Sequence, residues 1–111
     1  WVNYDGTSVV FNKKFPEEAK ALKHGMEEGL IEIANHGLTH CVVKDNLFRP
    51  KLFSSNRTYH REFWEWLGED LHYNHIKESQ DILQEFFDTD VVTLIPPGNV
   101  YCDFTVDAAK K

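Results

Sequence analysis

Long apolar runs, cysteines and an excess of positive charge are all missing or scarce in this sequence. No stretch approaches the roughly 18 apolar residues of a membrane-spanning helix, so we expect no membrane span. Two cysteines, Cys41 and Cys102, are too few for a disulfide scaffold; they are either buried thiols, which we favour, or one pair. The 12 Lys and Arg residues against 18 Asp and Glu argue against nucleic acid as the main partner, because its phosphates require clustered positive charge.

The composition nevertheless suits a folded chain of at most one domain. Hydrophobic residues make up 41% of the 111 residues and aromatic residues 14%, which excludes disorder by composition. Internal repeats and low-complexity tracts are absent. The chain does not start with Met, and both ends read as elements cut short. We therefore expect residues 1–111 to be a single fragment of a larger domain, truncated at both ends.

Helical and strand-like patterns alternate along the chain. Helices are predicted from Pro16 to a stop at Gly29, over 58–67 and over 70–87, and a further helix begins at 106–111. Short apolar runs predict strands at 1–4, 30–34 and 91–95, with residues 9–11 either extending the first or forming another, and residues 44–58 as loop. This alternation predicts an α/β fold with a mostly parallel sheet, as a piece of a larger barrel or sheet domain.

Two histidines four positions apart follow the predicted strand 30–34. If residues 37–40 form one helical turn, His36 and His40 point the same way and can bind one metal ion. Ligands of parallel α/β folds bind at the carboxyl ends of strands, where this pair is expected. Imidazole suits Zn²⁺, Co²⁺, Ni²⁺ or Fe²⁺, and at least one more protein ligand is needed. The alternative interpretation is two surface histidines on a loop.

The residues around this pair resemble a known family. Residues 32–40, Glu-Ile-Ala-Asn-His-Gly-Leu-Thr-His, resemble the second motif of the polysaccharide deacetylases, the NodB-type carbohydrate esterases. In that family both histidines of the motif bind the catalytic metal. Residues 94–98, Leu-Ile-Pro-Pro-Gly, resemble the third motif, which forms one wall of the active-site groove, and residues 16–32 resemble the helix before the histidine strand. The resemblance covers roughly residues 1–111.

This resemblance implies a distorted (β/α) barrel and a metal-dependent hydrolase. The enzyme would remove N-acetyl or O-acetyl groups from a polysaccharide or a related amide. A divalent ion, Zn²⁺ foremost, on His36 and His40 would polarise the acetyl carbonyl and lower the pKa of its bound water. The implied partner is a carbohydrate or another acetylated substrate, in a groove lined by Pro96, Pro97, Gly98 and Trp64.

The sequence also departs from the family pattern. Ala34 replaces a glycine of the second motif, Gly37 stands where Ser or Thr is common, and Leu94 stands where the third motif has arginine. The family's paired aspartates and its general-acid histidine would fall before Trp1 and after Lys111, so the chain alone is expected to be inactive. Two other interpretations stay open: a catalytically silent carbohydrate-binding member of the same fold, and an unrelated α/β domain.

Other polar residues are weaker candidates. His60 and Glu62 could line the groove, although a helix N-terminus packed with aromatic residues is favoured. Asp45 could be a late metal ligand, which is not favoured. His72 and His75 lie on the apolar side of the long predicted helix, which favours a structural role.

Overall fold

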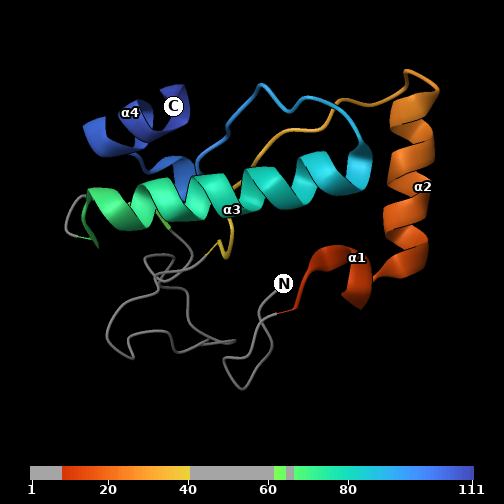
Figure 1. Cartoon of the computed structure of the whole chain (residues 1–111), viewed down its shortest axis with the longest axis horizontal. Coiled ribbons are helices and arrows are strands. Elements are labelled where there is room, and N and C mark those ends of the chain that lie inside the picture. The colour runs from red at the N-terminus through yellow and green to blue at the C-terminus, as the bar shows by residue number, and fades with distance from the viewer. Residues whose placement is uncertain (1–8, 41–61, 65–66) are drawn as a thin grey trace.

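Helices dominate the part of the chain that the structure, a computed structural model, describes: residues 9–40, 62–64 and 67–111. The elements in chain order are α1 (Phe11–Lys14), α2 (Pro16–Glu27), α3 (Glu69–Phe87), the 3₁₀ helix η3 (Pro97–Asn99) and α4 (Asp103–Lys110). Figure 1 shows α3 lying along the molecule, with α2 across one of its ends and α4 beside the other. The predictions of helices at 16–29 and 70–87 are confirmed.

Local signals explain where α2 and α3 begin and end. Pro16 is the first residue of α2, a position whose backbone N–H has no acceptor within the helix, so that proline loses no hydrogen bond there. Glu17 and Glu18 lie in the first turn, where their negative charge is stabilised by the positive end of the helix dipole. Gly29 follows α2 with a φ of 72°, the left-handed conformation that glycine adopts without strain. Asp88 ends α3 in the same conformation, with a φ of 52°. In the described ranges no helix is long and apolar enough to cross a bilayer, as predicted.

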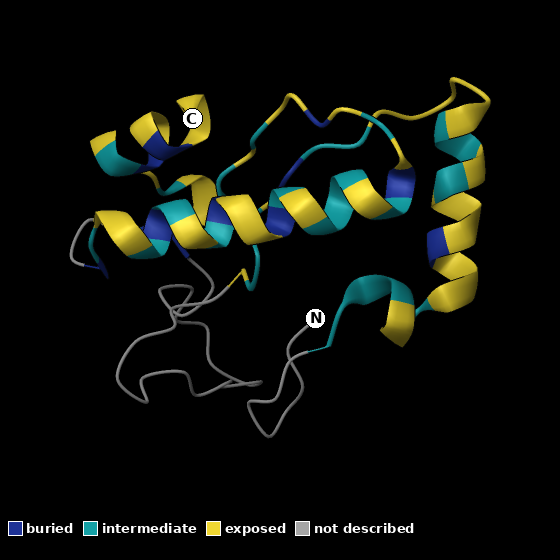
Figure 2. Ribbon diagram, in the orientation of Figure 1, coloured by how far each residue is buried: buried dark blue, intermediate teal, exposed yellow. Residues whose placement is uncertain are grey.

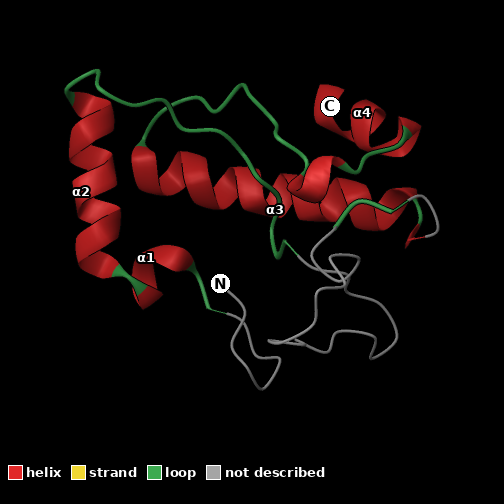
Figure 3. Cartoon of the chain, turned by 180° about the vertical axis from the view of Figure 1, so that it is seen from behind, coloured by secondary structure: helices red, strands yellow, loops and turns green. Residues whose placement is uncertain are grey.

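The predicted parallel sheet does not form within the described residues, so the prediction of an α/β fold and of a (β/α) barrel is wrong. Residues 30–34 and 91–95, the expected strands, are extended segments that meet at one parallel bridge, between Asn35 and Leu94. Two backbone hydrogen bonds of 2.8 Å flank it, from Asn35 N to Thr93 O and from Ile95 N to Asn35 O. Seen from behind in Figure 3, both segments are loops that run over α3.

The apolar runs failed as a guide because several of their side chains, those of Leu30, Ile31, Val92 and Ile95, are exposed. Leu30 is 79% exposed and Val92 is 84% exposed. An apolar run indicates a buried strand only where adjacent strands supply hydrogen bonds and a second layer supplies cover. A single bridge supplies no such continuous pairing, so these segments bury only some of their apolar side chains, Val91 among them.

Predictions near the other elements were mixed. Residues 9–11 do not form a strand, because α1 begins at Phe11 and the Phe11 ring packs on Phe86 and Phe87, with centroid distances of 5.3 and 5.8 Å. The last helix is confirmed but begins earlier, at Asp103. Of the predicted helix 58–67, residues 62–64 are not helical. The predicted strand 1–4 and loop 44–58 lie outside the described residues.

The hydrophobic core lies between α3 and α4. Phe63, Ile76 and Ala108 form its buried cluster, and the half-buried Tyr73 and Leu94 pack against it. Figure 2 shows buried positions recurring along α3 between exposed ones, as expected for an amphipathic helix. Full burial of a side chain such as that of Phe63 contributes about 1.5–3 kcal/mol.

His72 has the structural role that its position predicts. It is fully buried, its Nε2 donates to the Trp64 carbonyl at 2.8 Å, and its Nδ1 accepts from the Thr105 hydroxyl at 2.9 Å. Both ring nitrogens therefore have partners, and the ring links α3 to α4.

Candidate functional site

His36 and His40 lie on a tight turn that follows the bridge residue Asn35. The turn is not the helical turn predicted from the spacing, because Gly37 and His40 have left-handed φ values of 85° and 58°. The two imidazole rings nevertheless come together, with 4.9 Å between their centroids and 62° between their planes. Both histidines are exposed. The turn thus brings together two metal-ligating side chains at the surface.

The hydrogen bond of His36 leaves its outer nitrogen available to a metal. Its Nδ1 lies 2.6 Å from the Ile95 carbonyl oxygen. A carbonyl only accepts, so Nδ1 carries the proton and Nε2 carries the lone pair, the arrangement common in metal-ligating histidines. Two imidazoles on one tetrahedral ion, with bonds of about 2.0–2.1 Å, have centroids about 5 Å apart, which the observed separation of 4.9 Å matches.

The ligand set is incomplete within the described residues. No group of three or more His, Cys, Asp or Glu side chains suited to a metal ion occurs there. Asp45, the weaker ligand candidate, and His60 lie outside the described residues. A zinc site has at least three protein ligands, so His36 and His40 need a further donor.

A fully buried carboxylate lies directly under the turn. Glu62 is 0% exposed, and its Oε1 accepts hydrogen bonds from the backbone N–H groups of Leu38 at 2.9 Å and Thr39 at 3.0 Å. Its Oε2 accepts from the backbone N–H of His40 at 3.3 Å. The Nδ1 of His75, on α3, donates to Oε1 at 2.7 Å. Four donors therefore surround this carboxylate, which satisfies the condition for burying it.

Gly37 permits this close approach. A Cβ at Gly37 would lie 1.9 Å from Oε2 of Glu62 and 3.2 Å from Cγ of Pro97. The φ of 85° is also a conformation that residues with a side chain rarely adopt. The position therefore requires glycine for two independent reasons.

Asn35 joins the turn to α3. It is 1% exposed, and its Nδ2 donates to the Ile76 carbonyl at 3.3 Å and to Gln80 Oε1 at 3.2 Å. Its Oδ1 accepts from Gly37 N and from Ser79 Oγ, each at 2.9 Å. Because the same residue carries the bridge to Leu94, Asn35 aligns three segments of the chain.

The residues predicted to line the substrate groove differ in how far they are buried. Pro97 is buried and opens η3 beside Gly37, while Pro96 is half-buried and Gly98 is exposed. Trp64 is half-buried, and its carbonyl accepts from buried His72. The Pro-Pro-Gly segment therefore lies next to the histidine turn.

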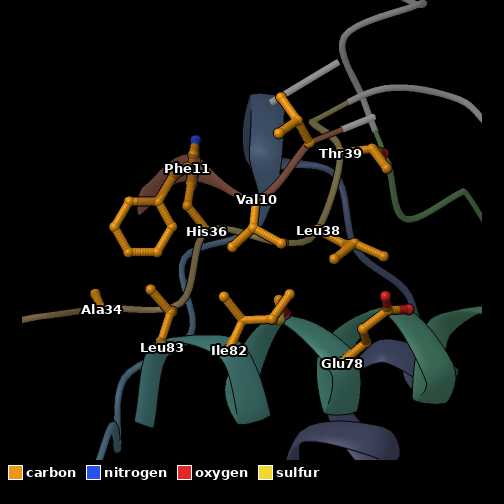
Figure 4. A pocket seen from close by; sticks show the side chains of 12 residues that line it. Val10, Phe11, Ala34, His36, Leu38, Thr39, Glu78, Ile82 and Leu83 are labelled. Atoms are coloured by element: carbon orange, nitrogen blue, oxygen red, sulfur yellow. The ribbon is translucent and has the colours of Figure 1, made fainter. Parts of the chain in front are cut away.

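A cavity of about 310 Å³ lies on another side of the turn. Figure 4 shows Ile82 and Leu83 rising from α3 toward Val10 and Leu38, with His36 in the wall. Its lining is mostly apolar. None of Pro96, Pro97, Gly98 and Trp64 lines this cavity, so it is separate from the predicted groove.

The sequence pattern missed the role of Glu62 and its hydrogen bond with His75, for which only a structural role was expected. Glu62 was expected to line the groove or to begin a helix, and the structure shows neither. It contacts residues 22 to 24 positions earlier in the chain and a histidine 13 positions later. No local spacing rule connects residues so far apart, so only the fold reveals this carboxylate.

Comparison with known proteins identified no relative of this chain. No model of a protein family matches the chain, and searches of curated proteins and of solved structures found no similar protein. The resemblance to the polysaccharide deacetylases therefore stays a prediction.

Proposed function

We propose that this chain supplies the two-histidine part of a divalent-metal site in a hydrolase that removes N-acetyl or O-acetyl groups from a polysaccharide or a related amide. The observation that carries the proposal is the pairing of His36 with His40, 4.9 Å between ring centroids, with Nδ1 of His36 bonded to the Ile95 carbonyl. The motif resemblance of residues 32–40 and 94–98 supports the reaction class.

In this proposal each group at the turn has a defined task. His36 and His40 bind the ion, and the Ile95 carbonyl fixes the ring orientation of His36. A divalent ion such as Zn²⁺, when bound, polarises the acetyl carbonyl and lowers the pKa of a bound water. The further metal ligand and the acid–base groups come from residues other than those described around the turn.

The proposed substrate is a carbohydrate polymer. The Pro96–Gly98 segment lies beside the turn, where the prolines restrict its backbone and Gly98 is exposed, so that it can form a wall for an extended chain of sugars. In this proposal Trp64 contributes an aromatic surface for sugar packing at the same groove.

A catalytically silent carbohydrate-binding protein is the second candidate, and Leu94 favours it. Leu94 packs against the core of Phe63, Ile76 and Ala108, at the position where the resembled motif has an arginine. No guanidinium can act at this position, so an aspartate in the intact protein would lack that partner.

Zinc calorimetry on the intact protein tests the proposal. We expect one Zn²⁺ per chain, with binding abolished by His36→Ala or His40→Ala and unchanged by His24→Ala, a control at an exposed histidine of α2. Release of acetate from acetylated glucosamine oligomers then tests the reaction. Absence of Zn²⁺ binding overturns the metal site and the hydrolase together, whereas binding without acetate release favours the silent carbohydrate-binding protein.

A further inference from the structure

We propose that Glu62 is a positioning residue for the two candidate metal ligands. Its buried carboxylate lies under the turn and fixes the backbone that carries His36 and His40. This inference rests on the proposed function, because it assigns to Glu62 the task of aligning the histidines for an ion.

The hydrogen bonds of Glu62 account for the shape of the turn. Three consecutive backbone N–H groups, from Leu38, Thr39 and His40, converge on one carboxylate. Convergence of consecutive amides on an anion requires a curved backbone, and the left-handed φ values at Gly37 and His40 provide that curvature. The turn is thus wound around the carboxylate.

The two carboxylate oxygens have different tasks. Oε1 accepts from Leu38, Thr39 and His75, whereas Oε2 accepts from the backbone N–H of His40. The contact at Oε2 therefore acts on the backbone of a candidate metal ligand itself. Loss of that acceptor would remove this restraint on the backbone of His40 while the hydrogen bonds at Oε1 persist.

His75 completes the arrangement from α3. Its Nδ1 donates to Oε1 at 2.7 Å, and its side chain is 14% exposed. The packed helix thereby fixes the carboxylate, and the carboxylate fixes the turn. Groups that orient metal ligands in this indirect way typically change metal affinity by about 10- to 100-fold when they are replaced.

The substitution Glu62→Gln tests the role of Oε2. An amide in the same volume keeps one accepting oxygen for Leu38 and Thr39 but directs an N–H₂ group at the N–H of His40. We expect the affinity for Zn²⁺ to fall by at least about tenfold at unchanged stoichiometry, measured by calorimetry on the intact protein. In metal-free protein, we expect amide hydrogen exchange to accelerate by at least about tenfold at His40, and less at Leu38 and Thr39.

Glu78→Gln is the matched control. Glu78 is an exposed residue of α3 beside the same turn, so its substitution makes the same charge change without touching the buried carboxylate. Zn²⁺ affinity and exchange in this variant should equal those of the wild type. Wild-type protein that binds no Zn²⁺ overturns the proposed function, whereas unchanged His40 exchange in Glu62→Gln overturns the positioning role by itself.

A second pair of variants applies if Glu62→Gln does not fold. The amide nitrogen of Asn can take the place of Nδ1 in His75→Asn, whereas His75→Leu removes the donor. We expect His75→Asn to keep wild-type exchange at His40 and His75→Leu to accelerate it by several-fold. Equal exchange in the two variants would show that the hydrogen bond to Glu62 has no influence on the turn, contrary to the inference.

Discussion

Two neighbouring regions of this protein are organised by opposite means. In the histidine turn, residues 35–40, the histidine side chains are exposed, but the backbone N–H groups of residues 37–40 donate to buried side chains, those of Asn35, 1% exposed, and Glu62, 0% exposed. In the extended segments 30–34 and 91–95, some apolar side chains remain in solvent, such as those of Leu30 at 79% and Val92 at 84%. Directional hydrogen bonds hold the first region, whereas the second is joined at a single bridge.

The difference shows how directional interactions select one geometry. A buried polar group without a partner costs about 1–3 kcal/mol, so conformations that satisfy the buried donors and acceptors are strongly favoured. Apolar burial has no such directional requirement, and an apolar run that nothing covers imposes no particular arrangement. For this reason the turn is specified in detail, while the segments beside it are joined only at the Asn35–Leu94 bridge.

The largest effect on stability is expected for Gly37→Ala. Its Cβ would lie 1.9 Å from Oε2 of Glu62, so overpacking adds to the strain of the left-handed φ. We expect a loss of about 3 kcal/mol or more in the free energy of unfolding, measured by urea denaturation. Gly29→Ala is the control, because Gly29 has a φ of 72° but no atom within 4 Å of the added Cβ, and it should lose only about 1 kcal/mol. Similar losses in both variants would show that the contact with Glu62 is unimportant.

An intermediate effect is expected for Asn35→Ala. The change removes four side-chain hydrogen bonds, to Ile76, Gln80, Gly37 and Ser79. We expect unfolding to become easier by about 2–3 kcal/mol, measured by chemical denaturation.

Asn12→Ala is the matched control for that substitution. The Oδ1 of Asn12 is buried and has no hydrogen-bond partner among the described residues. Its removal should therefore change stability by less than about 0.5 kcal/mol, since alanine also favours the helix in which it lies. A larger loss for Asn12→Ala than for Asn35→Ala would contradict the importance of satisfied polar groups.

The smallest effect is expected in the extended segment, at adjacent valines. Val92 is 84% exposed and Val91 is 5% exposed. Val92→Thr should change the unfolding free energy by less than about 0.5 kcal/mol, whereas Val91→Thr buries a hydroxyl and should lose about 1–2 kcal/mol. Thermal unfolding followed by circular dichroism measures both. Equal losses would mean that Val92 is covered in solution.

Helices α2 and α3 could be predicted because their signals are local. Pro16 with two acidic residues after it starts α2, and Gly29 stops it, and each of these effects acts within one helical turn. The sheet could not be predicted in this way, because strand formation depends on pairing with partners distant in sequence. Residues 30–34 and 91–95 have strand-like composition, yet they share a single bridge.

The candidate site was predictable only in part for the same reason. The spacing of His36 and His40 indicated a pair of imidazoles, and the rings do lie together. The helical turn expected to align them is absent, because Gly37 and His40 adopt left-handed conformations around Glu62. A rule based on spacing assumes a regular helical backbone. In this turn the backbone instead curves around the buried carboxylate of Glu62, which lies more than 20 residues away in the sequence.

The amino-acid sequence alone determined α2 and α3, their ends and the presence of two imidazoles four positions apart, because these depend on residues close to one another along the chain. The tertiary structure alone decided that the apolar segments form no sheet within the described residues and that Glu62 and Asn35 shape the histidine turn. Those outcomes depend on hydrogen bonds between residues more than 20 positions apart in the sequence. Tertiary packing decides which of these residues come into contact, and local propensity does not.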